Sequence, residues 1–174
     1  MRVDEREGTP PPAGGADLEA AAEEASCELQ LDLPDEGNDH FTNPDKEPDY
    51  GTTPPTSGPH LGVVDEVGVG AFADGAFLDA PPDNRVVHSL EHGRVAIQYS
   101  PDLSEEEQLA LKGLFDDDRP GVLLFPNPDM PYAVATTAWT QLMGCDTYEG
   151  ESTLEAVAAF RDEFRGKGPE AVVY

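Results

Sequence analysis

Residues 34–82 are crowded with proline, glycine and aspartate, and this stretch limits the possible folds more than any other part of the sequence. No hydrophobic periodicity survives there for more than a few residues, so neither a helix nor a long strand is predicted. A structureless stretch of this length is unusual inside a compact domain, where such segments are often functional or disordered. Because it contains His40 and His60, two of the four histidines, we expect it to be ordered and functional.

The second half of the chain is more regular. Three segments have the apolar or β-branched composition of strands: residues 94–100, 121–126 and 132–139. Together with two helices, they give the order β-α-β-β-α, which implies a small mixed sheet with helices packed on it. We therefore expect an α+β fold in which the long Pro/Gly-rich N-terminal segment wraps the sheet.

The two helices of this half are predicted at residues 104–115 and 152–166. Each begins with a serine followed three residues later by a glutamate, which is the pattern of a capping box. The pairs are Ser104 with Glu107 and Ser152 with Glu155. Gly166 is placed to end the second helix.

The N-terminal residues divide into a tail and the start of a domain. Residues 1–15 are charged and rich in proline and glycine, so we interpret them as a disordered acidic tail. Residues 16–26 favour a helix by their alanine and glutamate content. At 174 residues the chain is long enough for one domain with a real core, and we expect residues 16–174 to form it.

The chain has 36 acidic residues against 10 basic ones, which gives a formal net charge of −26. This charge repels nucleic acid and anionic lipid, so we expect neither to be a partner. Self-repulsion destabilises a compact acidic chain in dilute salt, and it nearly vanishes at molar salt, where the Debye length is about 3 Å. The acidic excess with few lysines is typical of halophilic proteins, with an ordinary acidic bacterial protein as the alternative.

The sequence also predicts a cytoplasmic protein without membrane insertion. No segment reaches the ~18 consecutive apolar residues of a membrane helix, and the N-terminus lacks the apolar core of a signal peptide. In a reducing cytosol, free thiols are the default for Cys27 and Cys145. The two can form a disulfide only if their Cα atoms lie within ~7 Å, which the sequence does not show.

All four histidines lie between residues 40 and 92. His88 and His92 are four residues apart, so one helical turn points both rings the same way, as two ligands of one metal ion require. His60 ends a run of proline and glycine that can hold its ring in place, and His40 follows a turn. Clustered neutral imidazoles suit zinc, copper or iron. We predict a copper or zinc site at His60, His88 and His92, with His40 as a further ligand.

Glu91 adds a second interpretation. With His88 and His92 it forms His-x-x-Glu-His, the inverzincin pattern, in which the glutamate is the general base on a zinc-bound water. The motif also resembles that of pitrilysin-type peptidases, for which Glu170 has nearly the spacing of a third ligand. Those peptidases are much larger and carry the motif on a long helix, whereas Gly93 ends the turn here. Glu91 is otherwise an acceptor that orients an imidazole, or a solvated carboxylate.

Softer ligands are also present. If Met130, Met143 or Cys145 joined the histidines, the site would favour copper over zinc. Met143 is more simply a flexible side chain that fills the hydrophobic core. A Ser–His pair that uses Ser57 or Ser89 lacks the turn that surrounds a nucleophilic serine.

Three functional hypotheses remain open. The first is a metal-binding protein that handles or senses copper or zinc. The second is a metal-dependent hydrolase or oxidoreductase with Glu91 as base. The third is a structural or interaction module in which the histidines are ordinary hydrogen-bonded residues and no metal is bound.

Four strings occur in an order that resembles one prokaryotic family: CELQLDLPDEGNDHF, YGTTPPTSGPHLG, VVHSLEHGRVAIQY and TTAW. Over residues 27–164 the chain is similar to the family named domain of unknown function 3105, which has no assigned activity. The resemblance implies these signature positions: His40, residues 54–60, His88, Glu91, His92, Gly93 and Trp139. Many relatives resemble exported or membrane-anchored proteins, and export would make a Cys27–Cys145 disulfide more credible.

Overall fold

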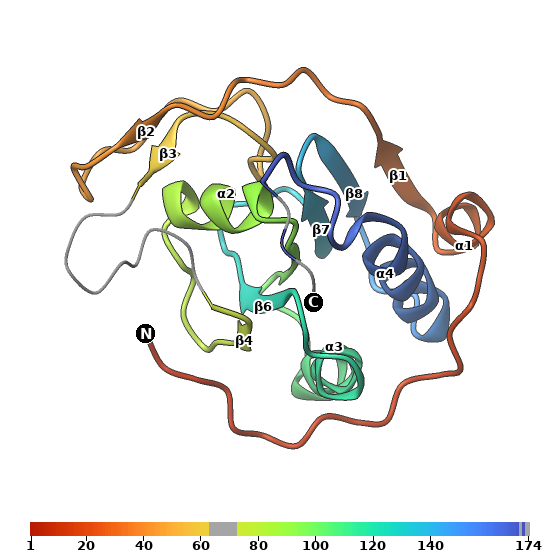
Figure 1. The fold of residues 1–174 in the computed structure, drawn as a ribbon. Helices are drawn as coiled ribbons and strands as arrows, with labels where there is room; N and C mark the ends of the chain where they lie inside the picture. The colour runs from red at the N-terminus through yellow and green to blue at the C-terminus, as the bar shows by residue number, and fades with distance from the viewer. Residues whose placement is uncertain (63–72, 171, 173–174) are drawn as a thin grey trace.

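A computed structural model describes the chain except for residues 63–72, 171 and 173–174 (Figure 1). The described residues form a six-stranded mixed sheet, a separate two-stranded pair, and helices on both faces of the large sheet. The helices are α1 (Leu18–Glu24), α2 (Asp83–Glu91), α3 (Glu105–Asp117) and α4 (Glu151–Phe164). The strands are β1 (Cys27–Gln30), β2 (His40–Phe41), β3 (His60–Leu61), β4 (Gly75–Ala76), β5 (Val95–Tyr99), β6 (Val122–Pro126), β7 (Val134–Ala138) and β8 (Gln141–Cys145). This architecture confirms the predicted α+β class.

The strands of the large sheet lie in the order β1-β8-β7-β5-β6-β4. Neighbours from β1 to β5 run antiparallel, whereas β5, β6 and β4 run parallel. The central strand β5 is buried at all five of its residues. The segments predicted as strands, residues 94–100, 121–126 and 132–139, correspond to β5, β6 and β7.

The prediction lacks β8. Its sequence, QLMGC, contains no β-branched residue and includes a glycine, so its composition does not indicate a strand. The strand forms because a tight turn at Trp139 and Thr140, where Thr140 has a φ of 60°, returns the chain antiparallel to β7. Tertiary pairing therefore overrides a weak local preference.

α3 begins as predicted, with a capping box. The Ser104 side chain accepts from the Glu107 N–H at 3.3 Å, and the Glu107 carboxylate accepts from the Ser104 N–H at 2.7 Å. These reciprocal bonds satisfy N–H groups that have no partner within the helix.

α4 is present, but its predicted capping box is wrong. The helix begins at Glu151 after Gly150, so Ser152 already lies inside the first turn and caps nothing. The N–H of Glu149 donates instead to the Thr153 hydroxyl at 2.8 Å. Gly150 permits this start because its φ is 64°, which a side chain would strain.

Alternate residues of β5 face opposite sides of the sheet. Val95 and Ile97 pack in the larger hydrophobic core with α1, α3 and α4, whereas Ala96 packs in a smaller core with α2. Figure 1 shows α2 on the opposite side of the sheet from α3 and α4. α2 is therefore the helix that holds its side chains over this second face.

Cys27 on β1 and Cys145 on β8 form a disulfide. The two residues are directly opposite in the antiparallel register, and their Cα atoms lie 4.2 Å apart. The pairing overturns the expectation of free thiols, which assumed a reducing cytosol, because disulfides persist in oxidising compartments. It also joins residues that are 118 positions apart, which restricts the unfolded chain.

Residues 2–9 differ from the predicted disordered tail. They run beside β4, where the Asp4 N–H donates to the Ala76 carbonyl at 2.8 Å. They then cross α3 so closely that Gly113 has no room for a Cβ beside the Thr9 carbonyl. The segment therefore covers the outer edge of β4, which would otherwise be open to pairing with another chain.

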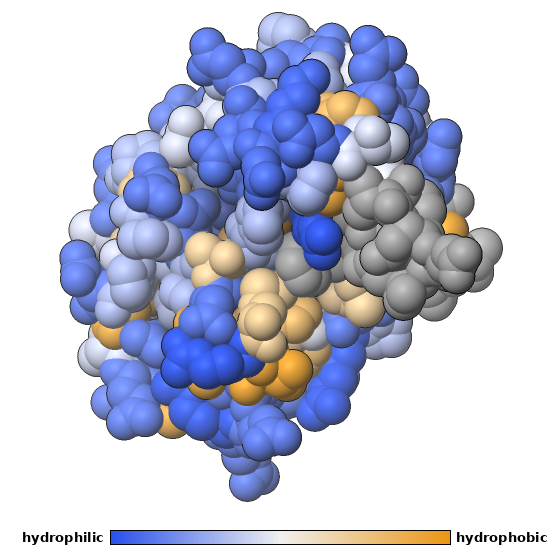
Figure 2. Space-filling view, turned by 90° about the vertical axis from the view of Figure 1, so that its left-hand side faces the viewer, coloured by the Kyte–Doolittle hydropathy of each residue, from blue (hydrophilic) through white to orange (hydrophobic). Residues whose placement is uncertain are grey.

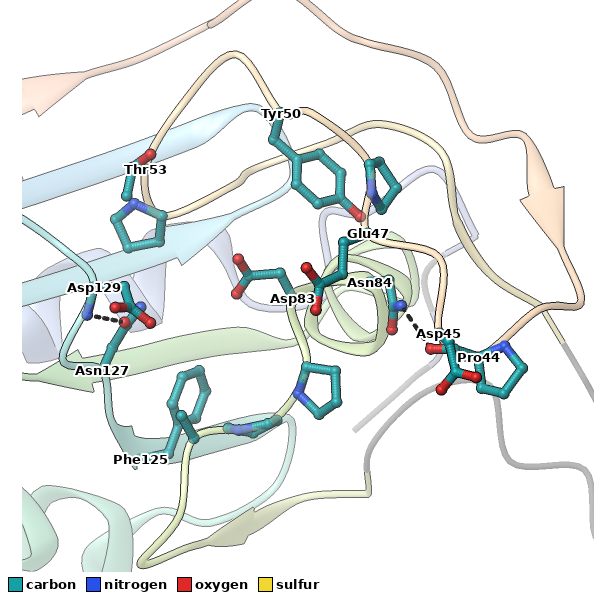
Figure 3. Close-up of a pocket in the computed structure, with 15 residues that line it drawn as sticks. Pro44, Asp45, Glu47, Tyr50, Thr53, Asp83, Asn84, Phe125, Asn127 and Asp129 are labelled. Atoms are coloured by element: carbon teal, nitrogen blue, oxygen red, sulfur yellow. Dashed lines mark hydrogen bonds between the residues drawn. The ribbon is translucent and has the colours of Figure 1, made fainter.

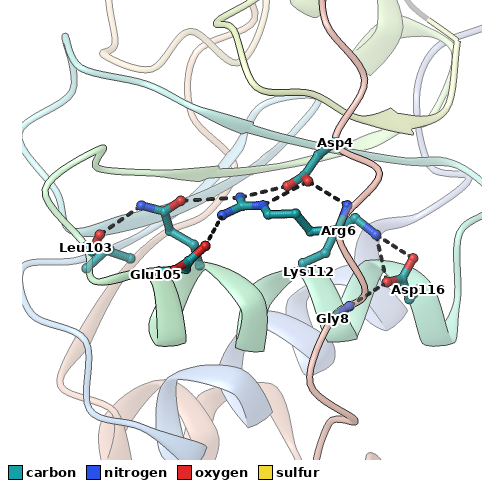
Figure 4. A network of polar contacts seen from close by, with 8 residues as sticks. Asp4, Arg6, Gly8, Leu103, Glu105, Lys112 and Asp116 are labelled. Carbon is teal, nitrogen blue, oxygen red and sulfur yellow. Dashed lines mark hydrogen bonds and ion pairs between the residues drawn. The ribbon is translucent and has the colours of Figure 1, made fainter.

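Polar contacts hold this segment on α3, including an ion pair between Arg6 and Glu105 at 3.7 Å (Figure 4). Arg6 contacts the buried carboxylate of Asp4 through two nitrogens, at 2.8 and 3.0 Å. Lys112 Nζ lies 2.7 Å from both carboxylate oxygens of Asp116, which also accepts from the Gly8 N–H at 3.1 Å. Arg2, Asp4 and Arg6, three of the charges that suggested disorder, are paired in the folded chain.

The face of the molecule shown in Figure 2 is predominantly hydrophilic, as the large acidic excess implies. Among the described residues, these large hydrophobic side chains are exposed: Met1, Val3, Leu31 and Val172. None of the described helices is long and apolar enough to cross a membrane.

Candidate metal centre

The Pro/Gly-rich segment brings two histidines together. β2 and β3 pair in parallel, with His40 directly opposite His60. The His60 N–H donates to the Asp39 carbonyl at 3.0 Å, which fixes the register of the pair. The two imidazole rings meet edge to face, with centroids 4.5 Å apart. Residues 34–62 of the Pro/Gly-rich segment contain little regular structure beyond this pair, and residues 63–72 of the segment lie outside the described residues.

α2 brings the other two histidines. Three buried side chains hold this helix against the sheet: Val86, Val87 and Leu90. His88 lies in the last turn and His92 caps the helix, after which Gly93 ends it with a φ of 82°. The Nε2 atoms of His88 and His92 lie 3.0 Å apart, so the four-residue spacing does point both rings the same way.

Three of these histidines and a glutamate converge on one point. His40, His60, His88 and Glu91 each offer a ligating atom, and these atoms all lie within 4.8 Å of one another. His60 Nε2 lies 3.1 Å from His40 Nε2 and 3.0 Å from Glu91 Oε2, and His40 Nε2 lies 3.3 Å from that oxygen. His92 contacts this group through His88 and belongs to a second group with Glu91 and Glu170.

Main-chain carbonyl groups fix the protonated nitrogen in three of the rings. Their Nδ1 atoms meet carbonyl oxygens in these pairs: His60 with Gly58 at 2.8 Å, His88 with Leu61 at 2.6 Å, and His92 with Glu170 at 3.1 Å. A carbonyl oxygen can only accept, so each Nδ1 carries the proton. In a neutral ring, Nε2 is then left with its lone pair, and these are the atoms that face one another in the cluster.

Glu91 is completely buried, which is costly for a carboxylate without a cationic partner. Of the residues that the structure describes, only His40 and His60 form ion pairs with it, and these count only if the rings are protonated. Its second oxygen, Oε1, has no hydrogen-bond partner. The described part of the chain therefore provides no permanent positive charge for this carboxylate.

Burial above all, with the neighbouring histidines, lowers the pKa of His88 to about 4, although the bond to the Leu61 carbonyl acts in the opposite direction. His88 is consequently neutral at pH 7. Neutral imidazole is the form that binds a metal ion.

The softer candidate ligands lie elsewhere. Met143 packs in the larger hydrophobic core and Met130 in a small one with Leu142, and Cys145 is part of the disulfide. Ser57 is also engaged away from the histidine rings, because its hydroxyl accepts from the Glu36 N–H at 3.0 Å. The donor set is therefore nitrogen and oxygen only.

Two features of the cluster could not be identified from a motif in the sequence. The carbonyl groups of Gly58 and Leu61 orient the rings, but main-chain atoms leave no signal in side-chain patterns. Trp139 packs edge to face on His60 with centroids 6.2 Å apart, and its Nε1–H donates to Asp35 at 3.3 Å. The family resemblance indicated Trp139 without giving it a role.

A separate cavity of about 560 Å³ lies at the N-terminal end of α2 (Figure 3). No histidine lines it, and four carboxylates do: Asp45, Glu47, Asp83 and Asp129. Burial raises the pKa of Asp83, and the charges of Asp129 and Glu47 add to the effect. Tyr50 joins this cavity to the cluster, because its hydroxyl donates to the carbonyl of Pro59, the residue before His60.

A family model described as a protein of unknown function (DUF3105) matches residues 42–173. The chain belongs to the DUF3105 family. The DUF3105 match includes His60, His88, Glu91 and His92 and begins just after His40. It confirms the resemblance noted in the sequence and assigns no activity. No curated protein and no solved structure matches the chain.

Proposed function

We propose that this DUF3105 protein binds a transition metal ion, zinc or copper, through His40, His60, His88 and Glu91, and that it serves in metal handling or sensing. One observation carries the proposal: imidazole nitrogens and a buried carboxylate oxygen face one another at 3.0–3.3 Å, and the bond from His60 Nδ1 to the Gly58 carbonyl leaves the His60 Nε2 of a neutral ring with its lone pair. A cation at the centre of such an arrangement satisfies the nitrogen and oxygen lone pairs together.

The spacing of the ligands supports this interpretation. Four ligands bound at about 2.0–2.1 Å, as nitrogen and oxygen are to zinc, stand about 3.3–3.4 Å apart at the corners of a tetrahedron. The three edges among His40, His60 and Glu91 measure 3.1, 3.0 and 3.3 Å. These edges are slightly shorter than those of a zinc tetrahedron, and a small outward movement of the ligands would match them to it.

The donor set narrows the choice of ion. Three imidazole nitrogens and one carboxylate oxygen suit zinc or copper(II), whereas copper(I) prefers thiolate and thioether sulfur. Glu91 supplies negative charge that offsets part of the charge of the ion. Its Oε2 lies as close to the His40 and His60 nitrogens as two ligands of one ion lie to each other. This position favours a role of Glu91 as a metal ligand over the alternative role of general base.

Exposure suggests how an ion exchanges. His60 and Glu91 are completely buried, whereas the His40 side chain is 40% exposed. His40 is thus the ligand that solvent or a partner reaches first, and its movement would open the site without disturbing α2. A buried set with one accessible ligand suits reversible binding, as handling and sensing require.

Elemental analysis tests the proposal directly. Protein stripped with a chelator is incubated with zinc or copper(II), dialysed and analysed for metal, and we expect at least one equivalent to remain. His60→Ala should lower the affinity by more than the 10–100-fold that loss of an outer hydrogen-bond partner typically causes. Glu91→Gln should also weaken binding, while Glu163→Gln, an exposed glutamate paired with Lys167, should not.

Two results would overturn the proposal. One is the absence of bound metal in the wild type after incubation with both ions. The other is equal affinity in the wild type and in a His60→Ala variant whose circular dichroism shows it to be folded. Either result would leave the histidines as a structural element.

A further inference from the structure

We infer that a second divalent ion binds beside the first, held by His92, Glu170 and the second carboxylate oxygen of Glu91. The ligating atoms of these three residues lie within 4.8 Å of one another. This inference rests on the proposed function, because Glu91 would bridge the two ions. Its ligands come from two parts of the chain that are far apart in sequence, the end of α2 and the segment after α4.

The segment after α4 is fixed to the end of α2 by main-chain bonds. The Gly166 N–H donates to the Gly93 carbonyl at 2.7 Å, and the Glu170 N–H donates to the Glu91 carbonyl at 3.0 Å. Between them, Gly168 passes so close to the Glu91 carbonyl that a Cβ would not fit. The position of Glu170 beside α2 is therefore built into the backbone and does not depend on its own exposed side chain.

The same segment orients His92. Its Nδ1–H donates to the Glu170 carbonyl at 3.1 Å, so its Nε2 presents a lone pair. That atom lies 3.0 Å from Nε2 of His88, which presents a lone pair as well. His92 groups at ligating distance with Glu91 and Glu170, whereas His88 groups with His40, His60 and Glu91, so Glu91 is the residue that the two groups share.

Glu91 provides the independent sign of a ligand. Oε2 faces His40 and His60, whereas Oε1 is buried and has no hydrogen-bond partner. A carboxylate that binds one ion through each oxygen satisfies both atoms. Paired ions in enzymes stand about 3.5–4 Å apart, a separation that one bridging carboxylate can span.

The chemistry of this second group differs from that of the first. One imidazole and two carboxylates make a harder donor set, which suits zinc, manganese or iron(II) and disfavours copper(I). Zinc fits both groups and is the appropriate probe. We expect the second ion to be held more weakly, because Glu170 is exposed and water must complete the coordination.

Zinc titration followed by calorimetry and elemental analysis separates the possibilities. The wild type should bind two equivalents, and Glu170→Gln should bind one with the tighter affinity changed less than about tenfold. Glu163→Gln is the matched control, an exposed glutamate near the end of α4, and should still bind two.

One equivalent in the wild type would overturn the second ion and leave the proposed function intact, whereas no bound zinc or copper would overturn both. Two equivalents in Glu170→Gln would likewise overturn the inference. His92→Ala is a second test at the same group, because it too should bind one equivalent if the assignment holds.

Discussion

Two polar networks in this protein each contain a buried carboxylate. They differ in whether the chain supplies that carboxylate with a cation. In the network between residues 4–8 and α3, each carboxylate meets a cation of the chain, the buried Asp4 with Arg6 and the half-buried Asp116 with Lys112 (Figure 4). In the histidine cluster, the buried carboxylate of Glu91 meets only ring nitrogens. The chain itself supplies the cations of the first network, whereas the second has none from the described residues, and for this reason we propose that it receives a metal ion.

Proton affinities follow the same division. Burial alone would raise the pKa of Asp4, but the hydrogen bonds and charge of Arg6 bring it below its ordinary value. Asp116 behaves alike, because Lys112 outweighs the effect of burial on its pKa. At His88 no carboxylate compensates, and burial lowers the pKa to about 4. The carboxylates of the α3 network therefore stay ionised, whereas His88 of the histidine cluster stays neutral.

The largest effect should come from filling the cluster. An ion at a hundred times its dissociation constant stabilises the folded state by about 2.7 kcal/mol, provided it does not bind the unfolded chain. For a domain of this size that corresponds to about 5–10 °C in Tm. We therefore expect zinc to raise the Tm of chelator-treated protein by this amount in a scanning calorimeter.

The matched control is the network on α3. Zinc should raise the Tm of Asp4→Asn by as much as that of the wild type, because Asp4 is not a ligand. It should raise the Tm of His60→Ala much less, because that variant lacks one ligand of the proposed first ion. An equal rise in all three proteins would mean that zinc acts elsewhere on the acidic surface, and the contrast between the networks would fail.

A second prediction exchanges an acid for its amide in each network. In metal-free protein at pH 8, Glu91→Gln removes a buried charge and gives His60 a hydrogen-bond donor, so we expect the free energy of unfolding to rise by about 1 kcal/mol. Asp4→Asn removes the partner of Arg6 and should lower it by about 1–2 kcal/mol, a modest loss because the Arg6 side chain is 31% exposed. Urea denaturation measures both.

The decisive result is that the two substitutions change the free energy of unfolding of metal-free protein in opposite directions. If Glu91→Gln destabilised the metal-free protein as much as Asp4→Asn does, Glu91 would already have its cation, and the cluster would be complete without a metal. With zinc present, the gain from Glu91→Gln should reverse, because the variant then loses a ligand.

Much of the fold could be predicted because the second half obeys local rules. β5, β6 and β7 follow from their apolar and β-branched composition, and α3 follows from the Ser104–Glu107 box. β8 could not be predicted, since QLMGC has no strand preference and forms only against β7. The packing of residues 2–9 was missed for a related reason, because composition counts charges and does not show which of them are paired.

The candidate site divides in a similar way. The spacing of His88 and His92 predicts that their rings share one side of a helix. In the structure their Nε2 atoms lie 3.0 Å apart, which confirms it. The meeting of His40 with His60 depends on the parallel pairing of β2 and β3, two strands too short to leave a periodic signal. Glu91 was considered as a base, and its place among the ring nitrogens follows from the tertiary fold alone.

The smallest expected effect is a difference in acid sensitivity. Because the folded pKa of Asp4 lies below its unfolded value of about 3.9, its contribution to stability is present above that pH and is lost as the pH falls through the folded pKa. We expect metal-free wild type to lose more stability than Asp4→Asn between pH 6 and pH 3, by less than about 1 kcal/mol, as solvent screens Arg6. Subtracting the two urea denaturation series cancels the titration of the histidines, which both proteins share. Parallel series would show that Asp4 has the same pKa folded and unfolded, so that Arg6 does not compensate its burial as the contrast with Glu91 requires.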